Sequence, residues 1–346
     1  MKKVILVLVF AAIMLVGMSA CRRDRIYVFN WGEFIYPPVL DMFEEEYGIR
    51  VIYTNYSSNE EMYESLASGG QFDVLFPSEY MIERLINEGR LARINFNNVP
   101  NARYIDNRFR NLPHDPQDAY SVPYKWGTMG LLYNVTMVDG PIDSWGILFE
   151  QDPRLDNNIF MYLSSRCTMA VALHYLGLSA NTTNIADIHA ARDLLISQGS
   201  MVRAFLTDQV ILAMPGNEAA LANVYSGDAL WMMDENPNLR FVNPREGVQL
   251  FVNSMVIPSN ARSQENAEKF INFMARPEIA YLNTMWIRYS TTNAGAFAML
   301  PDDWQNCHIY WPDDETIALG EVFTDLGEFR SEVERAWAEV LISHTR

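Results

Sequence analysis

Residues 25–48 read RIYVFNWGEFIYPPVLDMFEEEYG, and this stretch decides the fold class of the chain. Its first six residues, RIYVFN, carry the β-branched and aromatic side chains that favour a buried strand. The second half, PPVLDMFEEEYG, predicts a helix, because proline suits the first turn of a helix and Gly48 suits its end. A strand followed directly by a helix is the building unit of an α/β sheet.

The same order of strand and helix continues along the next forty residues. The segments are IRVIYT, SSNEEMYESLASGG, FDVLFP and SEYMIERLINEG, at residues 49–54, 57–70, 72–77 and 78–89. They read in turn as strand, helix, strand and helix. Strands that alternate with helices of this length predict a parallel sheet covered on both faces, and therefore an α/β fold.

Two long extended segments divide the chain into two parts. YSVPYKWGTMGLLYN (120–134) leaves the first α/β unit, and GVQLFVNSMVIP (247–258) is a candidate return crossing. The residues between them hold helices and short strands of their own, and DALWMM (228–233) reads as one of these strands. A chain that leaves one lobe, builds another and returns predicts a two-lobed α/β protein with a hinge and an interlobe ligand cleft.

Length and charge agree with this division. The chain has 346 residues, which at about 150 residues per domain gives two domains. The formal net charge is −17, so the chain lacks the basic stripe of a nucleic-acid-binding protein. A cationic ligand or partner is favoured electrostatically instead.

The N-terminus predicts export. Lys2 and Lys3 precede an apolar run at residues 4–16, which is too short for a comfortable transmembrane helix, and GMSAC follows. Small residues directly before a cysteine resemble a bacterial lipoprotein cleavage site. We expect residues 1–20 to be a signal peptide and Cys21 to carry the lipid that anchors a periplasmic protein to the membrane.

Two cysteines remain, and the residues for catalysis are missing. Cys167 and Cys307 could pair in an exported protein, although two inert thiols are favoured in domains of this size. The five histidines are scattered without metal-ligand spacing, and the chain has no phosphate-binding glycine loop and no nucleophile elbow. We expect no enzyme activity, no metal and no cofactor.

The ends of the expected strands carry one kind of chemistry. In open α/β sheets, ligands bind outside the carboxyl ends of the strands. The residues expected there are Trp31, Glu33, Phe34, Ser78, Glu79, Tyr80, Asp234, Glu235, Phe251 and Asn253. Carboxylates hydrogen-bond an ammonium group, and aromatic rings attract the same cation and cover its methylenes. The set therefore predicts a site for an organic cation, although any single residue could equally be a packing or solvated residue.

Four longer stretches carry a resemblance to a known family. They are FNWGEFIYPPVLDMFEEEYGIRVIYTNYSSNEEMYESL, FPSEYMI, PYKWGTMGLLYN and SMVIPSNARSQENAEKFINFMARPEIA. Together they resemble the periplasmic spermidine/putrescine-binding proteins of bacterial ABC importers, over nearly the whole mature chain. The resemblance implies a two-lobed receptor that closes on its ligand. It also implies a monomer that delivers its ligand to an ABC permease, with lobes formed by residues 22–128 plus 252–300 and 133–247 plus 302–346.

The resemblance also implies a set of binding residues. The positions that match the family's site are Trp31, Glu33, Phe34, Ser78, Tyr80, Thr207, Phe251 and Tyr289. Ser164, Cys167 and Asn253 stand where spermidine-binding members have acidic residues, and Asp234 stands where the family has a stacking tryptophan. Fewer carboxylates favour a diamine, so putrescine is expected to bind more tightly than spermidine. Alternatives are another small cationic solute in the same fold, or a sensory lipoprotein that uses the cleft as a switch.

Overall fold

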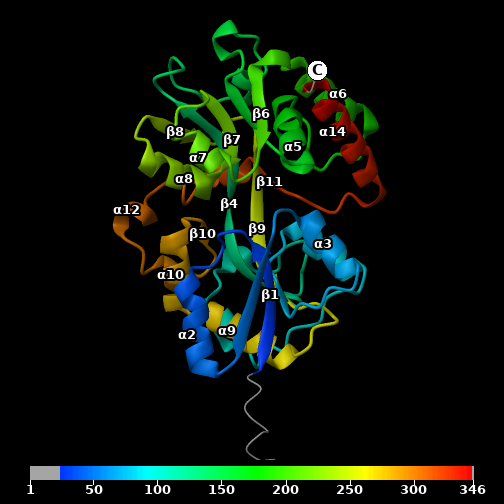
Figure 1. Cartoon of the computed structure of the whole chain (residues 1–346), viewed down its shortest axis with the longest axis vertical. Helices are drawn as coiled ribbons and strands as arrows, with labels where there is room; N and C mark the ends of the chain where they lie inside the picture. The colour runs from blue at the N-terminus through cyan, green and yellow to red at the C-terminus, as the bar shows by residue number, and fades with distance from the viewer. Residues whose placement is uncertain (1–23, 345–346) are drawn as a thin grey trace, which may run out of the picture.

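Residues 24–344, which the computed structural model describes, form two lobes joined by extended segments (Figure 1). The first lobe is the lower one in Figure 1 and the second lobe is the upper one. The first lobe contains β1 (Arg25–Trp31), α2 (Pro37–Tyr47), β2 (Arg50–Tyr56), α3 (Asn59–Ala67), β3 (Val74–Leu75), α4 (Glu79–Asn87), α9 (Gln264–Met274), α10 (Pro277–Ile287), β10 (Ser290–Thr291) and α11 (Ala294–Phe297). The second lobe contains β5 (Ile159–Tyr162), α5 (Ser165–Tyr175), α6 (Ile185–Ser197), β6 (Val202–Leu206), α7 (Val210–Ala213), β7 (Leu221–Tyr225), α8 (Ser226–Glu235), β8 (Leu239–Val242) and α14 (Arg330–His344).

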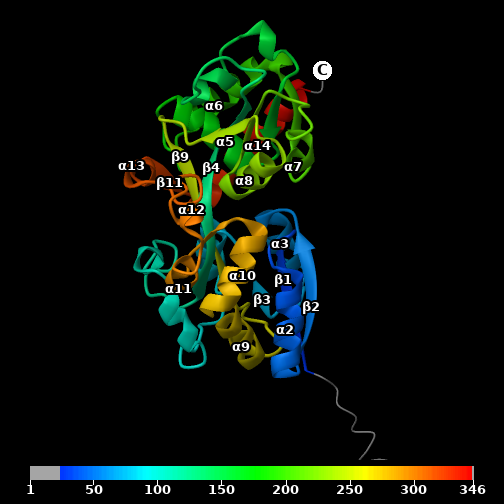
Figure 2. The same cartoon turned by 90° about the vertical axis from the view of Figure 1, so that its left-hand side faces the viewer.

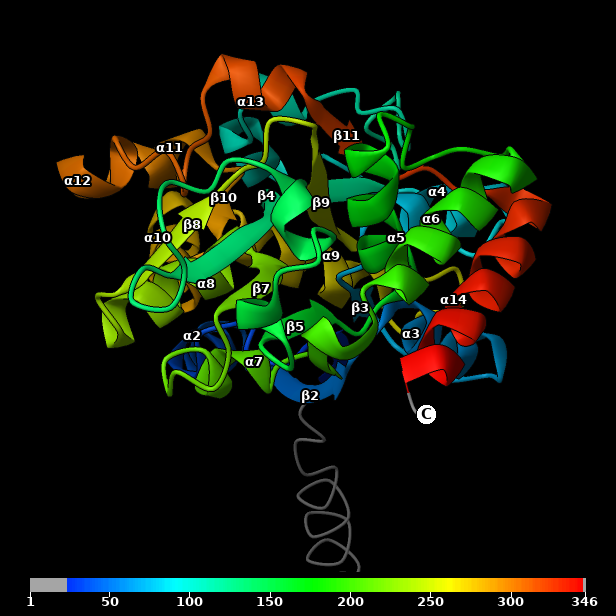
Figure 3. The ribbon, with the colours of Figure 1, turned by 90° about the horizontal axis from the view of Figure 1, so that it is seen from above.

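The strands within each lobe pair mostly in parallel, as the alternation of strand and helix predicts. β1 is parallel to β2 and β3, and β5 is parallel to β6 and β7. The first helix begins with the proline pair and ends at Gly48, which has the left-handed backbone (φ 68°) that glycine adopts without strain. Viewed from above, α5, α6 and α14 lie on one side of the second lobe's strands, and α7 and α8 lie on the other (Figure 3). The α/β fold class is confirmed.

Two long strands run between the lobes. β4 (Ser121–Asn134) and β9 (Val248–Val256) are antiparallel, with Trp126 opposite Val252 (Figure 2). Both occupy the extended segments expected from the sequence. β9 pairs with β3 near its first-lobe end and with β11 (Gly320–Val322) near its second-lobe end. β11 is a third crossing, which leads into α14.

The third crossing starts later than the expected division at residues 302–346. The short helices α12 (Asp302–Gln305) and α13 (Asp314–Ala318) precede it. Trp311 and Ile317, which the sequence assigns to the second lobe, pack against the hydrophobic core of the first lobe. The change of lobe therefore comes at β11 and not at residue 302.

One expected strand is wrong. DALWMM belongs to α8, and the strand of this region is β7, which starts seven residues before DALWMM. Ala229 and Met232, three residues apart, are buried while Trp231 is exposed, which is the periodicity of a helix and not of a strand. This shift changes which residues stand at a strand end of the second lobe.

The hydrophobic side chains gather in the two lobes and at the crossing between them. Phe43, Phe76 and Phe270 lie in the first-lobe core, and Trp145 and Leu221 lie in the second. Within residues 24–344 no disulfide forms, and no helix is long and apolar enough to cross a membrane. The expected signal peptide and Cys21 lie outside the described residues.

Candidate ligand-binding site

A continuous run of five aromatic rings connects the lobes. Phe34 and Tyr289 of the first lobe have ring centroids 5.4 Å apart, and Tyr289 is 5.8 Å from Phe251 on the crossing strand β9. Phe251 is 5.1 Å from Tyr225 at the end of β7, which is 5.3 Å from Tyr162 at the end of β5. The structure thus brings together Phe34, Phe251 and Tyr289, which the sequence nominated, with two tyrosines that it did not.

A carboxylate lies beside this run. Asp228 is in the first turn of α8, three residues after the end of β7, and its side chain is partly buried. Burial raises the pKa of Asp228 to about 7; a hydrogen bond from the Tyr289 hydroxyl lowers it in part, and the negative charge of Asp208 raises it. Among the described residues Asp228 forms no ion pair with lysine or arginine. A carboxylate held in this way gains most from an incoming cation.

The first turn of the first lobe supplies a second carboxylate. Trp31 ends β1, donates its indole N–H to the Phe76 carbonyl at 2.8 Å and packs 4.7 Å from the Tyr56 ring. Glu33 follows with a left-handed backbone (φ 52°) and an exposed side chain. It makes no hydrogen bond or ion pair with its side chain in the described part of the chain. The expected Trp31–Glu33 turn is therefore present, with its carboxylate available to a ligand.

This turn touches the second lobe. A β-carbon placed on Gly32 would lie 3.8 Å from Oδ2 of Asp208, which follows β6. Thr207, the residue before it, donates its hydroxyl to Gln209 Oε1 at 3.1 Å. The expected site residue Thr207 thus stands at the strand end facing the first lobe, next to a carboxylate that the sequence analysis overlooked.

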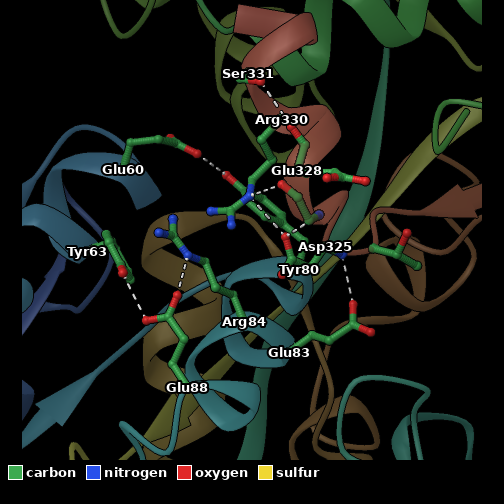
Figure 4. Close-up of polar contacts among 12 residues, drawn as sticks. Glu60, Tyr63, Tyr80, Glu83, Arg84, Glu88, Asp325, Glu328, Arg330 and Ser331 are labelled. Atoms are coloured by element: carbon green, nitrogen blue, oxygen red, sulfur yellow. Dashed lines mark hydrogen bonds and ion pairs between the residues drawn. The ribbon is translucent and has the colours of Figure 1, made fainter. Parts of the chain in front are cut away.

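The polar atoms of Ser78 and Tyr80 already have partners. Ser78 Oγ accepts hydrogen bonds from Asn59 Nδ2 at 3.1 Å and from Asn253 Nδ2 at 3.3 Å. The Tyr80 hydroxyl donates to Glu60 Oε1 at 2.9 Å, as Figure 4 shows. These three expected residues, Ser78, Tyr80 and Asn253, form a network within the first lobe and its crossing strand.

Glu79 is bonded to the crossing strand and is not an open carboxylate, contrary to the expectation for a strand end. It is fully buried, and Oε2 accepts a hydrogen bond of 2.9 Å from the Val252 amide in the middle of β9. Burial raises the pKa of Glu79 to about 7. Its role is to satisfy an edge amide of the crossing strand where neither β3 nor β11 pairs with it.

Two uncharged residues stand at the start of α5 in the second lobe. Ser164 caps this helix by accepting a hydrogen bond from the Cys167 amide. Cys167 is buried, and its sulfur lies 3.1 Å from the Tyr225 hydroxyl. Both residues are close to the aromatic run, so the departures noted in the sequence fall beside Tyr225.

Asp234 has a different environment from the one expected. It lies in the last turn of α8, and Oδ2 accepts a hydrogen bond from Nη1 of Arg288. Arg288 belongs to the first lobe and ends α10. The strand of this region is LANVY and not DALWMM, so Asp234 does not stand at a strand end. The correct strand would have delivered Tyr225 and Asp228.

Comparisons with known proteins agree with this arrangement. The profile of the bacterial extracellular solute-binding protein family matches residues 39–310. The chain belongs to this family. Its members bind solutes and do not transform them, so the protein is not an enzyme.

Relatives of this solute-binding protein cover almost the whole chain. The spermidine/putrescine-binding periplasmic protein of Salmonella typhimurium is 34% identical over 93% of each chain. The putrescine-binding periplasmic protein PotF of Escherichia coli is 27% identical over 94% of this chain and 93% of its own.

A solved structure from Streptococcus pneumoniae shares the fold. It is the spermidine/putrescine ABC transporter substrate-binding protein PotD, with 32% identity, a TM-score of 0.81 and coverage of 93% of this chain and 99% of its own. The resemblance read from the sequence and the two-lobed fold are therefore confirmed.

Proposed function

We propose that this protein captures a polyamine between its lobes and delivers it to an ABC permease. The observation that carries the proposal is Asp228, a carboxylate beside a run of aromatic rings that has no basic partner among the described residues. The names of the relatives support polyamines as the solute class.

The geometry supports a two-ended mode of binding. One ammonium group hydrogen-bonds to Asp228 in the second lobe, and the other to Glu33 in the first lobe. The methylenes between them lie against Phe251, Tyr225 and Tyr289, which also attract the cation by about 0.5–2 kcal/mol per ring. Because each lobe contributes one carboxylate, the ligand itself holds the lobes together.

We further propose that putrescine binds more tightly than spermidine. A third ammonium group needs an anionic partner when it loses water. Ser164, Cys167 and Asn253 are uncharged. Asp208 lies beside Gly32, so its carboxylate faces the same end of the ligand as Glu33 and shares that ammonium instead of serving a third one.

Calorimetric titration with putrescine, cadaverine, spermidine and spermine tests both proposals. Removing one partner of a buried charge pair costs about 3–5 kcal/mol, so Asp228→Asn should weaken putrescine binding about 100-fold or more. Glu235→Gln is the matched control, because it removes one charge from an exposed position of the same helix and should bind as the wild type does.

Each outcome decides between the alternatives. A folded wild-type protein that binds none of the four amines would refute polyamine binding and favour another cationic solute or a sensory role. Tighter binding of spermidine than of putrescine would refute the diamine preference alone. Equal loss in Asp228→Asn and Glu235→Gln would remove Asp228 from the site.

We also propose that the mature protein carries lipid on Cys21. The support is the sequence GMSAC after a short apolar run. Mass spectrometry of the N-terminal peptide from native membranes should find a diacylglyceryl-modified cysteine at residue 21. An unmodified Cys21, or cleavage at another residue, would contradict this.

A further inference from the structure

We propose that helix α8 and the corner formed by Arg288 and Tyr289 make a closure contact between the lobes, in which Gly227, Asp234 and Arg288 set polyamine affinity without themselves touching the polyamine. The contact has two parts, the packing of the Tyr289 ring on Gly227 and the ion pair between Asp234 and Arg288. Gly227, Asp234 and Arg288 act as positioning residues for Tyr289 and the closed lobes. The inference rests on the proposed function for its ligand, and on the geometry alone for the contact.

Helix α8 and the corner formed by Arg288 and Tyr289 contact each other at two places. α8 of the second lobe carries Asp228 in its first turn and Asp234 in its last. The first lobe presents Arg288 and Tyr289, which follow α10 directly. α8 lies directly above α10 in Figures 1 and 2. One helix and one corner therefore combine the ligand-binding groups, Asp228 and Tyr289, with an ion pair outside the site.

Gly227 is the residue that lets the Tyr289 ring approach. A β-carbon placed on Gly227 would lie 2.4 Å from Cδ2 of Tyr289 and 2.6 Å from Cε2 and Cγ. Its backbone is not in the left-handed region, where glycine is favoured for conformational reasons. Alanine is also the better helix former at such a position. Glycine is therefore required by the close approach of the other lobe and not by the local fold.

The ion pair lies outside the aromatic site. The side chains of Asp234 and Arg288 are 58% and 29% exposed, so their pairing contributes little to the stability of either lobe. Arg288 has a left-handed backbone (φ 62°) as the C-cap of α10, and this turn directs the chain into Tyr289. An exposed pair that joins two lobes acts on the closure equilibrium.

The opposite side of the molecule shows a contact of another kind. Glu83 of α4 accepts a hydrogen bond of 2.8 Å from the Asp325 amide, and Asp325 Oδ1 is 3.2 Å from Arg330 Nε (Figure 4). Asp325 follows the crossing strand β11 by three residues, so the chain itself keeps it close to α4. Asp234 and Arg288 have no such tether, and their contact is the one that hinge opening separates.

The contact predicts how three variants behave. Gly227→Ala should leave the melting temperature of the unliganded protein unchanged or raised, yet weaken putrescine binding about tenfold or more through steric overpacking. Arg288→Gln should weaken binding about two- to fivefold, and the exchanged pair Asp234→Arg with Arg288→Asp should restore it. Arg245→Gln is the matched control, because the Arg245–Asp143 pair is exposed and lies within the second lobe.

Small-angle X-ray scattering without ligand separates this inference from the proposed function. Gly227→Ala and Arg288→Gln should have a larger radius of gyration than the wild type and Arg245→Gln. If no amine binds to the wild type, the proposed function fails, but this scattering difference still supports the closure contact. If Gly227→Ala binds putrescine as tightly as the wild type and scatters identically, the closure contact is refuted while the proposed function stands. Should Gly227→Ala fail to fold, Arg288→Gln and the exchanged pair decide by the same two measurements.

Discussion

Lowering the pH from 8 to 6 should weaken putrescine binding about tenfold, because Asp228 must be ionised to hold an ammonium group. The pKa of Asp228 is raised to about 7 by burial and by the charge of Asp208. About ten in eleven Asp228 side chains are therefore ionised at pH 8, and about one in eleven at pH 6. Putrescine itself keeps both charges over this range, because its amines titrate near pH 10, as lysine does.

Calorimetry in two buffers with different heats of ionisation measures the proton that accompanies this change. At pH 7 the binding of one putrescine should release about half a proton from Asp228. Asp228→Asn should abolish the release. Glu79→Gln should retain it, because Glu79 also has a pKa raised to about 7 but is buried against β9. An affinity that stays constant from pH 6 to 8, with no proton released, would refute the assignment of Asp228.

The unliganded protein should show the opposite dependence in its stability. The pKa of Asp228 in the folded state lies above its value in the unfolded chain, so the folded state binds more protons between about pH 4 and pH 7. The stabilisation that protonated Asp228 gives to the folded state is fully present below pH 4 and is lost as the pH rises through 7. The melting temperature without ligand should fall over this window, and saturating putrescine should recover more of it at pH 8 than at pH 6.

Four further predictions concern other residues. Glu33→Gln should weaken putrescine binding more than Trp31→Leu, since a lost charge partner costs more than a lost ring, and unchanged affinity in Glu33→Gln would exclude that carboxylate. Lys125 is fully buried with a pKa lowered well below its usual value by desolvation, so Lys125→Met should raise the melting temperature by a few degrees. Above pH 7, where Asp228 is already ionised, the wild-type stability should rise toward about pH 10, where the unfolded lysine loses its proton, and a flat profile there would contradict the burial of a neutral amine. The double variant Ser164→Asp with Cys167→Glu should increase the affinity for spermidine relative to that for putrescine. An unchanged ratio of the two affinities in calorimetric titration would contradict this prediction.

Much of the fold could be predicted because its signals are local. The proline pair at the start of α2 and Gly48 at its end define the helix by the chemistry of their own backbone. β4 is long, apolar and interrupted by a proline and two glycines, and β9 is an apolar run bounded by Gly247 and Pro258, so the extended state of both could be predicted. A short apolar run such as DALWMM fits the periodicity of a strand as well as that of a helix, so its sequence does not decide between the two. The strand of that region is fixed by its pairing with β4, where Val224 lies opposite Gly130, and this is a tertiary contact.

The site could be predicted only in part. Phe34, Phe251 and Tyr289 lie in the aromatic run, as expected. Which of several adjacent polar residues faces that run depends on the rotation of the first turn of a helix. Ser78, Glu79 and Tyr80 begin α4, where successive side chains point about 100° apart. Glu79 consequently points to the crossing strand. Sequence alone fixes the neighbourhood of such residues but not their direction.

The adjacency of Gly227 and Asp228 links the charge of the ligand to closure. A cation bound at Asp228 favours its ionised form, and an ionised carboxylate accepts a stronger hydrogen bond from the Tyr289 hydroxyl. That hydrogen bond holds the Tyr289 ring on Gly227, where the absence of a side chain permits contact. A neutral solute of the same shape would leave Asp228 largely protonated at pH 6 and the hydrogen bond weaker. In the proposed mode of binding, selectivity for cations therefore depends on Tyr289, which packs one lobe against the other, as well as on the carboxylates.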